Sequence, residues 1–488
     1  MSTASLLGRA RRILPVVDLY GFMALAFLGT FLAIAVVLIF TPKLGLTLML
    51  GALIGTALIA AGPRLTFPLY FATLFSFGFN LPGLPMSLNR VLALAFFGSW
   101  IVALGRRHFR IPNTPAVYLL GLTTIYAVVT SALLSLGGAE LPIQPVFYFV
   151  VALAVGSWYR RPSDYLELIG IALTITCAFH SIGIIEYIIR RDLFREFSDV
   201  KTYGDRLRIN GISKNAIQYA YIATFMTPLA LLLATNARTA RVRKWSLLAV
   251  GFLLLGCLLT LNRQTPIILF AMFCVGLPLL RYRYRGRLAM AMVVGALAVS
   301  PAIVAKALPR IQTIFRPAET TKPDISLAIR ADKLKIAFEI IQDRPLFGVG
   351  LNNFDAYHRL YIPTGELYLV QYDVYSRHYV DMGFVQLLTE TGLVGLGGAL
   401  LFFLAAAGLW IGGFRRACAI RSTTFYRNAY AALAMMYVQM LMSLLVQDTF
   451  YLPWNFLLFG FLLAVTTMTR DAWVREHTPP LTPESSTP

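Results

Sequence analysis

The chain has 488 residues, of which 58% are hydrophobic and 14% are charged. In soluble domains about a quarter of all residues are charged, so this composition excludes an ordinary water-soluble enzyme. The formal net charge of +20 would suit a nucleic-acid partner. However, most basic residues lie in short links between apolar stretches, which is typical of membrane topology, and we expect no nucleic-acid binding.

Apolar stretches long enough to cross a bilayer recur along nearly the whole chain. They predict an all-α, polytopic membrane protein with about fourteen transmembrane helices, because a helix satisfies its own backbone hydrogen bonds in lipid. The first stretch is too long for a signal-peptide core, and we expect it to remain as an anchor. The predicted spans are 19–40, 44–61, 65–80, 89–105, 115–136, 144–159, 165–189, 215–235, 245–262, 265–280, 288–305, 380–411, 428–447 and 452–469.

The distribution of arginine predicts that both termini are cytoplasmic. The links assigned to the inside are rich in Arg and Lys, whereas the short outside links 137–143 and 448–451 carry none. The resulting organisation is a cytoplasmic N-terminus 1–18, a first membrane part 19–305, an extracytoplasmic loop domain 306–379 between spans 11 and 12, a second membrane part 380–469, and a disordered cytoplasmic tail 470–488.

The long loop 306–379 contains the pattern of an amphipathic helix from Ile325 to Ile341, ended by Asp343-Arg344-Pro345. We expect this helix to belong to a folded cap over the membrane domain, since long loops in compact proteins tend to be functional. Its apolar positions are Leu327, Ile329, Leu334, Ala337, Phe338 and Ile341.

The four cysteines, Cys177, Cys257, Cys274 and Cys418, have no paired spacing, and we interpret all of them as structural. No Walker sequence, dinucleotide fingerprint or His-Glu-x-x-His helix is found. Soluble nucleotide chemistry is therefore not expected.

Arginines facing the outside are the strongest functional candidates: Arg206, Arg208, Arg263 and Arg330. Arg263 occupies a very short link between two apolar spans, where a charge is costly unless it is paired or used. One interpretation is that its planar guanidinium clamps a phosphate-bearing lipid. The alternative is that it reaches the lipid headgroups and binds nothing specific. For Arg208 and Arg330, the alternative is a solvated or lipid-facing charge.

Two longer runs carry a family resemblance. The first begins at Arg330-x-x-x-Leu334 and continues to Asp343-Arg344-Pro345-Leu346-Phe347-Gly348-Val349-Gly350-Leu351-Asn352-Asn353-Phe354. The second is Gln386-Leu387-Leu388-Thr389-Glu390-Thr391-Gly392-Leu393-Val394-Gly395. Together they resemble the O-antigen ligase and polymerase superfamily. The segment around Arg263 is similar to that family's Arg-containing link between membrane helices, and Arg208-x-x-Gly211 is similar to its Arg-x-x-Gly element.

The resemblance implies glycan transfer at the periplasmic face of the bacterial inner membrane. An oligosaccharide on undecaprenyl pyrophosphate would move to an acceptor hydroxyl, either of another lipid-linked glycan (polymerase) or of lipid A-core (ligase). It implies Arg208, Arg263 and Arg330 as pyrophosphate-binding residues. Further substrate contacts would be Arg206, Asn215 and Glu390. Because the sequence supplies arginine rather than clustered carboxylates, we expect an inverting, metal-independent transferase without a cofactor, embedded among membrane lipids.

The sequence departs from the family at two places. The His-Asn pair of family ligases falls here on Asp381 and Met382, with His378 three residues earlier, and Asn-Pro-Asn reads Asn215-Ala216-Ile217. Asp381 is a candidate base by itself, or it orients His378 as the base. The alternative is that both only cap a helix. The missing pair favours a polymerase over a ligase.

Two other classes of protein fit the sequence less well. A transporter or flippase of lipid-linked oligosaccharide usually has internal repeats and polar residues at mid-membrane. No repeat is evident here, and of Glu167, His180 and Glu186 only His180 lies at depth, where we interpret it as a hydrogen-bonded helix-packing residue. A receptor or scaffold would leave Arg263 without a role.

Overall fold

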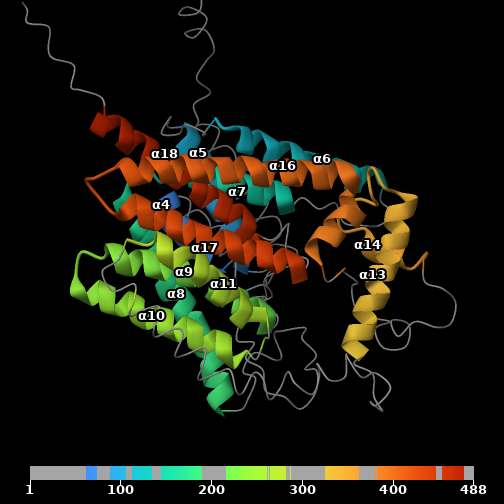
Figure 1. Ribbon diagram of the computed structural model, residues 1–488, viewed down its shortest axis with the longest axis horizontal. Coiled ribbons are helices and arrows are strands. Elements are labelled where there is room, and N and C mark those ends of the chain that lie inside the picture. Colours follow the sequence, from blue (N-terminus) through green and yellow to red (C-terminus); the bar gives the residue numbers. More distant parts are fainter. Residues whose placement is uncertain are drawn as a thin grey trace, which may run out of the picture. The chain divides into compact units, whose positions relative to one another are not determined.

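The computed structural model describes residues 62–73, 88–105, 113–134, 144–189, 216–260, 262, 264–281, 286, 325–361, 380, 382–446 and 453–477. All regular secondary structure in these ranges is α-helical, which confirms the predicted fold class. The helices, labelled as in Figure 1, are α4 (Pro63–Thr73), α5 (Leu88–Gly105), α6 (Pro115–Leu134), α7 (Gln144–Trp158), α8 (Pro162–Ile189), α9 (Ala216–Asn236), α10 (Ala240–Leu259), α11 (Gln264–Leu279), α13 (Ile325–Asp343), α14 (Phe354–His358), α16 (Gly383–Ala419), α17 (Phe425–Val446) and α18 (Pro453–His477).

Seven of the described helices are long and apolar enough to cross a bilayer, namely α6, α8, α9, α10, α16, α17 and α18, and α7 and α11 are shorter apolar helices. The chain is therefore a multi-pass membrane protein. The total of about fourteen spans stays a prediction, because the predicted spans 19–40, 44–61 and 288–305 lie outside the described residues.

The chain forms two compact units, one of residues 1–109 with 195–199 and one of 110–194 with 200–488. In the first unit, α4 packs against α5 through aromatic side chains, with the rings of Phe67 and Phe96 5.1 Å apart. The hydroxyls of Thr66 and Ser99 are hydrogen-bonded at 2.9 Å across the same interface.

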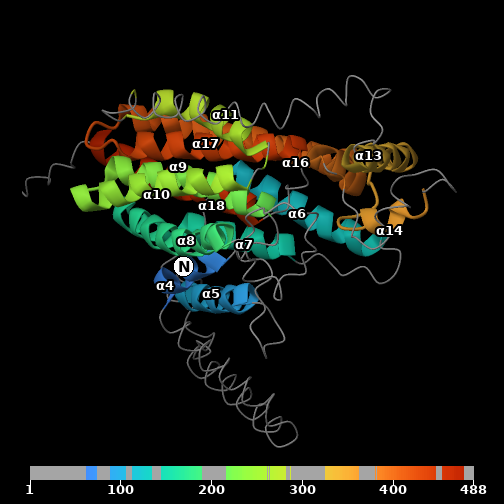
Figure 2. The same ribbon diagram turned by 90° about the horizontal axis from the view of Figure 1, so that it is seen from below.

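The second unit holds the candidate site. Figure 2 shows α9 between α10 and α17. Gln439 of α17 ties this contact together, since its amide nitrogen donates to the Tyr221 carbonyl at 3.0 Å and to the Thr224 hydroxyl at 2.6 Å. Helix α18 approaches α7 closely at Gly156 and Gly460, as a Cβ at Gly156 would lie 2.7 Å from Leu463 Cβ. Small residues permit such approaches between membrane helices.

His180 has the packing role expected from the sequence. Its side chain is 3% exposed, and its ring nitrogens lie 3.0 Å from the Thr176 carbonyl and 3.3 Å from the Tyr219 carbonyl. Tyr219 in turn donates its hydroxyl to the His180 carbonyl at 2.7 Å. These bonds join α8 to α9, which confirms the interpretation of His180 as a hydrogen-bonded helix-packing residue.

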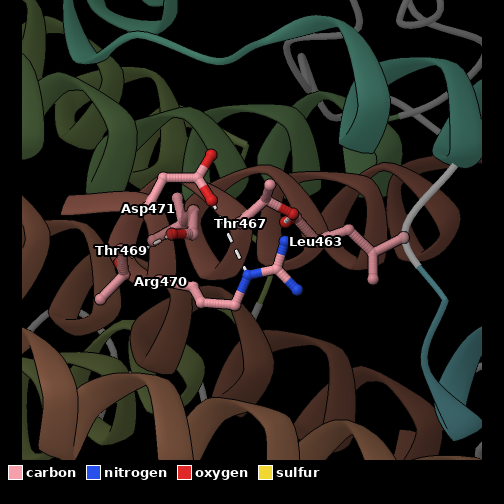
Figure 3. A network of polar contacts seen from close by, with 6 residues as sticks. Leu463, Thr467, Thr469, Arg470 and Asp471 are labelled. Carbon is pink, nitrogen blue, oxygen red and sulfur yellow. Dashed lines mark hydrogen bonds and ion pairs between the residues drawn. The ribbon is translucent and has the colours of Figure 1, made fainter. Parts of the chain in front are cut away.

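The last turns of α18 become polar. Arg470 and Asp471 form an exposed ion pair at 3.7 Å (Figure 3). The hydroxyls of Thr467 and Thr469 instead donate hydrogen bonds within the same helix, to the carbonyls of Leu463 and Val465. An exposed pair of this kind adds little stability. It marks the polar end of a helix whose preceding part is apolar.

The amphipathic helix expected in the long loop is present as α13. Its buried face is formed by Ile336, Ala337 and Ile340, which pack with Val349, Phe354, Tyr357 and Val380 in one cluster. The expectation for Phe338 is wrong, because this side chain is 53% exposed. Ile336 and Ile340 are one helical turn apart, and Phe338 falls between them on the opposite side of α13. In Figure 1, α13 and α14 lie beside the first turns of α16 and the end of α6.

Candidate functional site

The two sequence runs that carry the family resemblance meet at a break in α16. Gly392 has φ 65° and ψ −170°, so the helix is interrupted at this residue. In an unbroken helix, the carbonyls of Thr389 and Glu390 would accept from the amides of Leu393 and Val394. At the break, these four groups lose their partners within the helix and need others, because buried backbone groups are rarely left unpaired.

The turn after α13 supplies all four partners. The amides of Val349 and Gly350 donate to the carbonyls of Thr389 and Glu390, at 3.1 and 2.7 Å. The carbonyls of Pro345 and Leu346 accept from the amides of Leu393 and Val394, at 2.9 and 3.2 Å. The turn therefore replaces the two missing helical hydrogen bonds and fixes the loop to the membrane helix.

Glycine makes this close approach possible. Gly348 and Gly350 have φ of 67° and 88°, a region that favours glycine. A Cβ on Gly392 would collide with the Leu346 carbonyl, and one on Gly350 would lie 2.8 Å from the Cα of Ser131. The glycines of both runs are therefore explained by the contact between them.

The end of α6 holds the turn from its other side. The Ser131 hydroxyl donates to the Leu351 carbonyl at 2.7 Å, and the Tyr357 hydroxyl donates to the Leu134 carbonyl at 3.0 Å. Tyr126 donates to the carbonyl of Thr391, next to the break, at 2.9 Å. Helix α6 contains none of the site residues predicted from the sequence, yet it contacts both motifs.

Glu390 lies at the centre of this arrangement and is 2% exposed. Its Oε1 accepts a hydrogen bond from Gln386 Nε2 at 2.6 Å, and Gln386 Oε1 accepts from the Val380 amide at 2.7 Å. The proposed contact of Glu390 with substrate stays a prediction, and the observed partner is Gln386. Gln386 was missed as a site residue, although its spacing of four from Glu390 on a helix was a usable signal.

The link between α10 and α11 forms the second part of the candidate site. Asn262 Oδ1 accepts from the Gln264 amide, two residues further on, at 3.2 Å, which forms an Asx-turn directly before α11. Three neighbouring buried atoms have no hydrogen-bond partner within the part of the chain that the structure describes: Asn262 Nδ2, Gln264 Oε1 and Thr265 Oγ1. Thr265 is 1% exposed. These three residues flank Arg263 in the sequence, and none of them was among the predicted site residues.

Arg330 is the only pyrophosphate-binding candidate among the described residues. It lies in the first half of α13 and is exposed. The other predicted site residues, Arg206, Arg208, Asn215, Arg263, His378 and Asp381, lie outside the described residues. Whether these candidates meet in one site is therefore still a prediction.

No group of three or more His, Cys, Asp or Glu side chains that could hold a metal ion is found within the described ranges. The metal independence expected from the sequence stays a prediction.

An apolar cavity of about 260 Å³ lies in the membrane domain. Its lining is largely aromatic and aliphatic and includes Phe402, Phe403, Trp410, Phe456 and Phe459. A sugar pyrophosphate requires charged partners, and none of the residues that line this cavity is charged. The polar part of a glycan donor would not bind there.

The fold and these contacts define an all-α, multi-pass membrane protein in which a loop helix is fixed to a broken membrane helix. Residues 248–400 match the family described as O-Antigen ligase, a range that includes the 262–265 link, α13 and the break in α16. This confirms the resemblance to the O-antigen ligase and polymerase superfamily over the matched part of the chain. No curated protein matches the chain.

Proposed function

We propose that this protein is a polysaccharide polymerase that moves a glycan from undecaprenyl pyrophosphate to a hydroxyl of another lipid-linked glycan. The reaction would take place at the periplasmic face of the bacterial inner membrane. The family match supports the type of enzyme. The donor, the acceptor and the side of the membrane are the proposal.

The unpartnered polar atoms at the start of α11 carry this proposal. A buried polar atom without a partner costs about 1–3 kcal/mol, and such atoms are rare in folded proteins. Here three occur within four residues, at Asn262, Gln264 and Thr265. A ligand that supplies their hydrogen bonds accounts for the cluster. The Asn262 amide and the Thr265 hydroxyl are donors suited to phosphate oxygens, and Gln264 Oε1 is an acceptor suited to a sugar hydroxyl.

Two further features of this link favour an anion. The N-terminus of α11 presents backbone amides and the positive end of the helix dipole. Arg263 adds a permanent charge in a planar fork that matches phosphate. Pyrophosphate is the leaving group of the proposed reaction, and fixed positive charge beside it would stabilise the negative charge that develops as it departs.

The chemistry is a single displacement at the anomeric carbon. The acceptor hydroxyl oxygen forms a bond to that carbon while the bond from the carbon to the pyrophosphate oxygen breaks. The pyrophosphate keeps the electron pair, and the hydroxyl proton passes to a base, for which Asp381 and His378 are the candidates. Attack from the face opposite the leaving group inverts the configuration.

A ligase that acts on lipid A-core is the second candidate, and the description of the matched family favours it. The polymerase is preferred because Asp381 and Met382 stand where family ligases carry His-Asn.

The test is an assay of the purified protein in lipid nanodiscs with an undecaprenyl-pyrophosphate-linked oligosaccharide, with and without lipid A-core. Chains longer than the donor glycan in the absence of lipid A-core are the expected result. A conjugate formed only when lipid A-core is present would assign the ligase instead. Failure of both products with several donor glycans would overturn the proposal.

A further inference from the structure

Gln386 is the side chain that ties Val380, the residue before Asp381 in the sequence, to α16. It is 2% exposed, and both ends of its amide are used. The Val380 amide is a donor and the Glu390 carboxylate is an acceptor, so the amide oxygen must face Val380 and the amide nitrogen must face Glu390. The orientation of Gln386 is therefore fixed by its two partners.

The start of α16 explains why such a tie is needed. Met382 is the N-cap residue, with extended φ −142° and ψ 110°, and its side chain makes no capping hydrogen bond. In a capping box, a side chain in the first turn reaches back to a backbone amide at the helix start. Gln386 does the same from one position further along and reaches further back, to Val380. It thus fixes the backbone just before the helix.

Val380 is held from a second direction by its side chain. It is 0% exposed and packs in the cluster with Ile336, Ile340, Phe354 and Tyr357. Its amide and its side chain together fix the residue that directly precedes Asp381 and lies two residues after His378. Any base at either position depends on where Val380 is held, because a displacement of about 1 Å can cost about a hundredfold in rate.

The tie continues into the break of α16. Glu390 accepts from Gln386 through its side chain and from the Gly350 amide through its carbonyl, at 2.6 and 2.7 Å. Hydrogen bonds therefore run without interruption from the turn after α13, through Glu390 and Gln386, to the backbone beside the candidate base.

We infer that Gln386 is a positioning residue, which places the base carried by His378 or Asp381 through the Val380 amide and is itself oriented by Glu390. This inference rests on the proposed function. The two residues of the Gln-x-x-x-Glu pattern, Gln386 and Glu390, would then hold the base in position. Gln386 would affect the reaction through that base and not by binding the substrate.

The variant that tests it is Gln386→Met, which keeps the length of the side chain and removes both hydrogen bonds. The expected result is a fall in kcat of about 10- to 100-fold. This is less than the loss of about 10² to 10⁴ expected when a base is removed, because the base is displaced and not lost. The KM for the lipid-linked donor should stay within about threefold, because both ends of the Gln386 amide are already used by Val380 and Glu390. Gln386→Glu keeps an acceptor for Val380 and should recover part of the lost rate.

A second background separates positioning from general stability. In a His378→Ala, Asp381→Ala chain, Gln386→Met should lower the residual rate by less than about twofold, because residues that act as a unit are not additive. The matched control is Gln439→Met, which removes a buried glutamine of α17 whose amide nitrogen donates two hydrogen bonds. Any loss of rate it causes should be equal in both backgrounds.

Equal losses for Gln386→Met in the two backgrounds would overturn the inference, as would full activity of that variant in the native chain. If Gln386→Met does not fold, Gln386→Glu measured in both backgrounds decides by the same criterion. A native protein that forms no product overturns the proposed function and this inference with it. A native protein that turns over while Gln386→Met is unaffected overturns this inference alone.

Discussion

The amide of Gly350 donates to the carbonyl of Glu390 at 2.7 Å, where an unbroken α16 would have used the amide of Val394. This bond joins two motifs that are forty residues apart in the sequence. The loop after α13 and the first turns of α16 are thus one structural unit. A substitution in either motif should disturb the other.

Gly392→Ala is the sharpest test of that unit. Alanine at φ 65° and ψ −170° is strained by about 1–3 kcal/mol, and its Cβ would collide with the Leu346 carbonyl. We expect a lower thermal unfolding midpoint and a loss of transfer activity.

Gly397→Ala is the control for this change. It lies five residues further along the same helix, with open space where the Cβ would be. Alanine in a helix interior should be neutral or stabilising by about 0.5–1 kcal/mol. If the unfolding midpoint falls equally for the two variants, the break at Gly392 has no special requirement for glycine, and the expectation is contradicted.

Thr265→Val should separate stability from binding. The Thr265 hydroxyl is buried and without a partner, so replacing it with a methyl group removes an unsatisfied group that costs about 1–3 kcal/mol. We expect an unchanged or higher unfolding midpoint of the ligand-free protein, together with a higher KM for the lipid-linked donor. A lower midpoint with normal KM would show that the hydroxyl serves the fold rather than the ligand.

Arg263→Ala should abolish transfer without reducing membrane insertion, because one residue in a very short link does not set topology in a chain with so many arginines inside. Arg263→Lys should also be largely inactive, since a lysine lacks the bidentate fork. Arg241→Ala, at an exposed position of α10, removes the same charge and is the control. Normal product from Arg263→Ala at equal expression would refute this role.

Transfer should survive EDTA without added metal. The reason is the arginine-rich composition of the predicted outside motifs, since Mg²⁺ and Mn²⁺ sites are built from carboxylates. Product formation is measured before and after chelation. A rate that is lost with EDTA and restored by magnesium or manganese would contradict the expectation.

The base is tested by single and double alanine variants of His378 and Asp381. A positioned base typically contributes about 10² to 10⁴ in rate. If the two residues act as a pair, each single variant should lose most of the rate and the double variant little more. Loss confined to Asp381→Ala would assign the carboxylate alone. Full activity of the double variant would show that neither residue is the base.

The sequence by itself determined the class of the protein and the course of its main helices. Hydropathy is a local property, and lipid requires each apolar stretch to satisfy its backbone internally, so the spans at α6, α8, α9, α17 and α18 could be predicted from their own residues. The bounds of α13 were predicted in the same way, since the apolar period and Pro345 act within a few residues. The motifs also led to the family.

Only the tertiary structure decided how these parts meet. The break at Gly392 is stable because the turn at 345–350 replaces its lost hydrogen bonds, and no local pattern around Gly392 contains that information. The same holds for the buried face of α13, where Ile340 rather than Phe338 packs inward, and for the Gln386 amide between Val380 and Glu390. Partners that are distant in sequence satisfy these groups. The atoms of Asn262, Gln264 and Thr265 that lack a partner were also not predictable from the sequence, because burial and hydrogen bonding depend on the tertiary contacts around them.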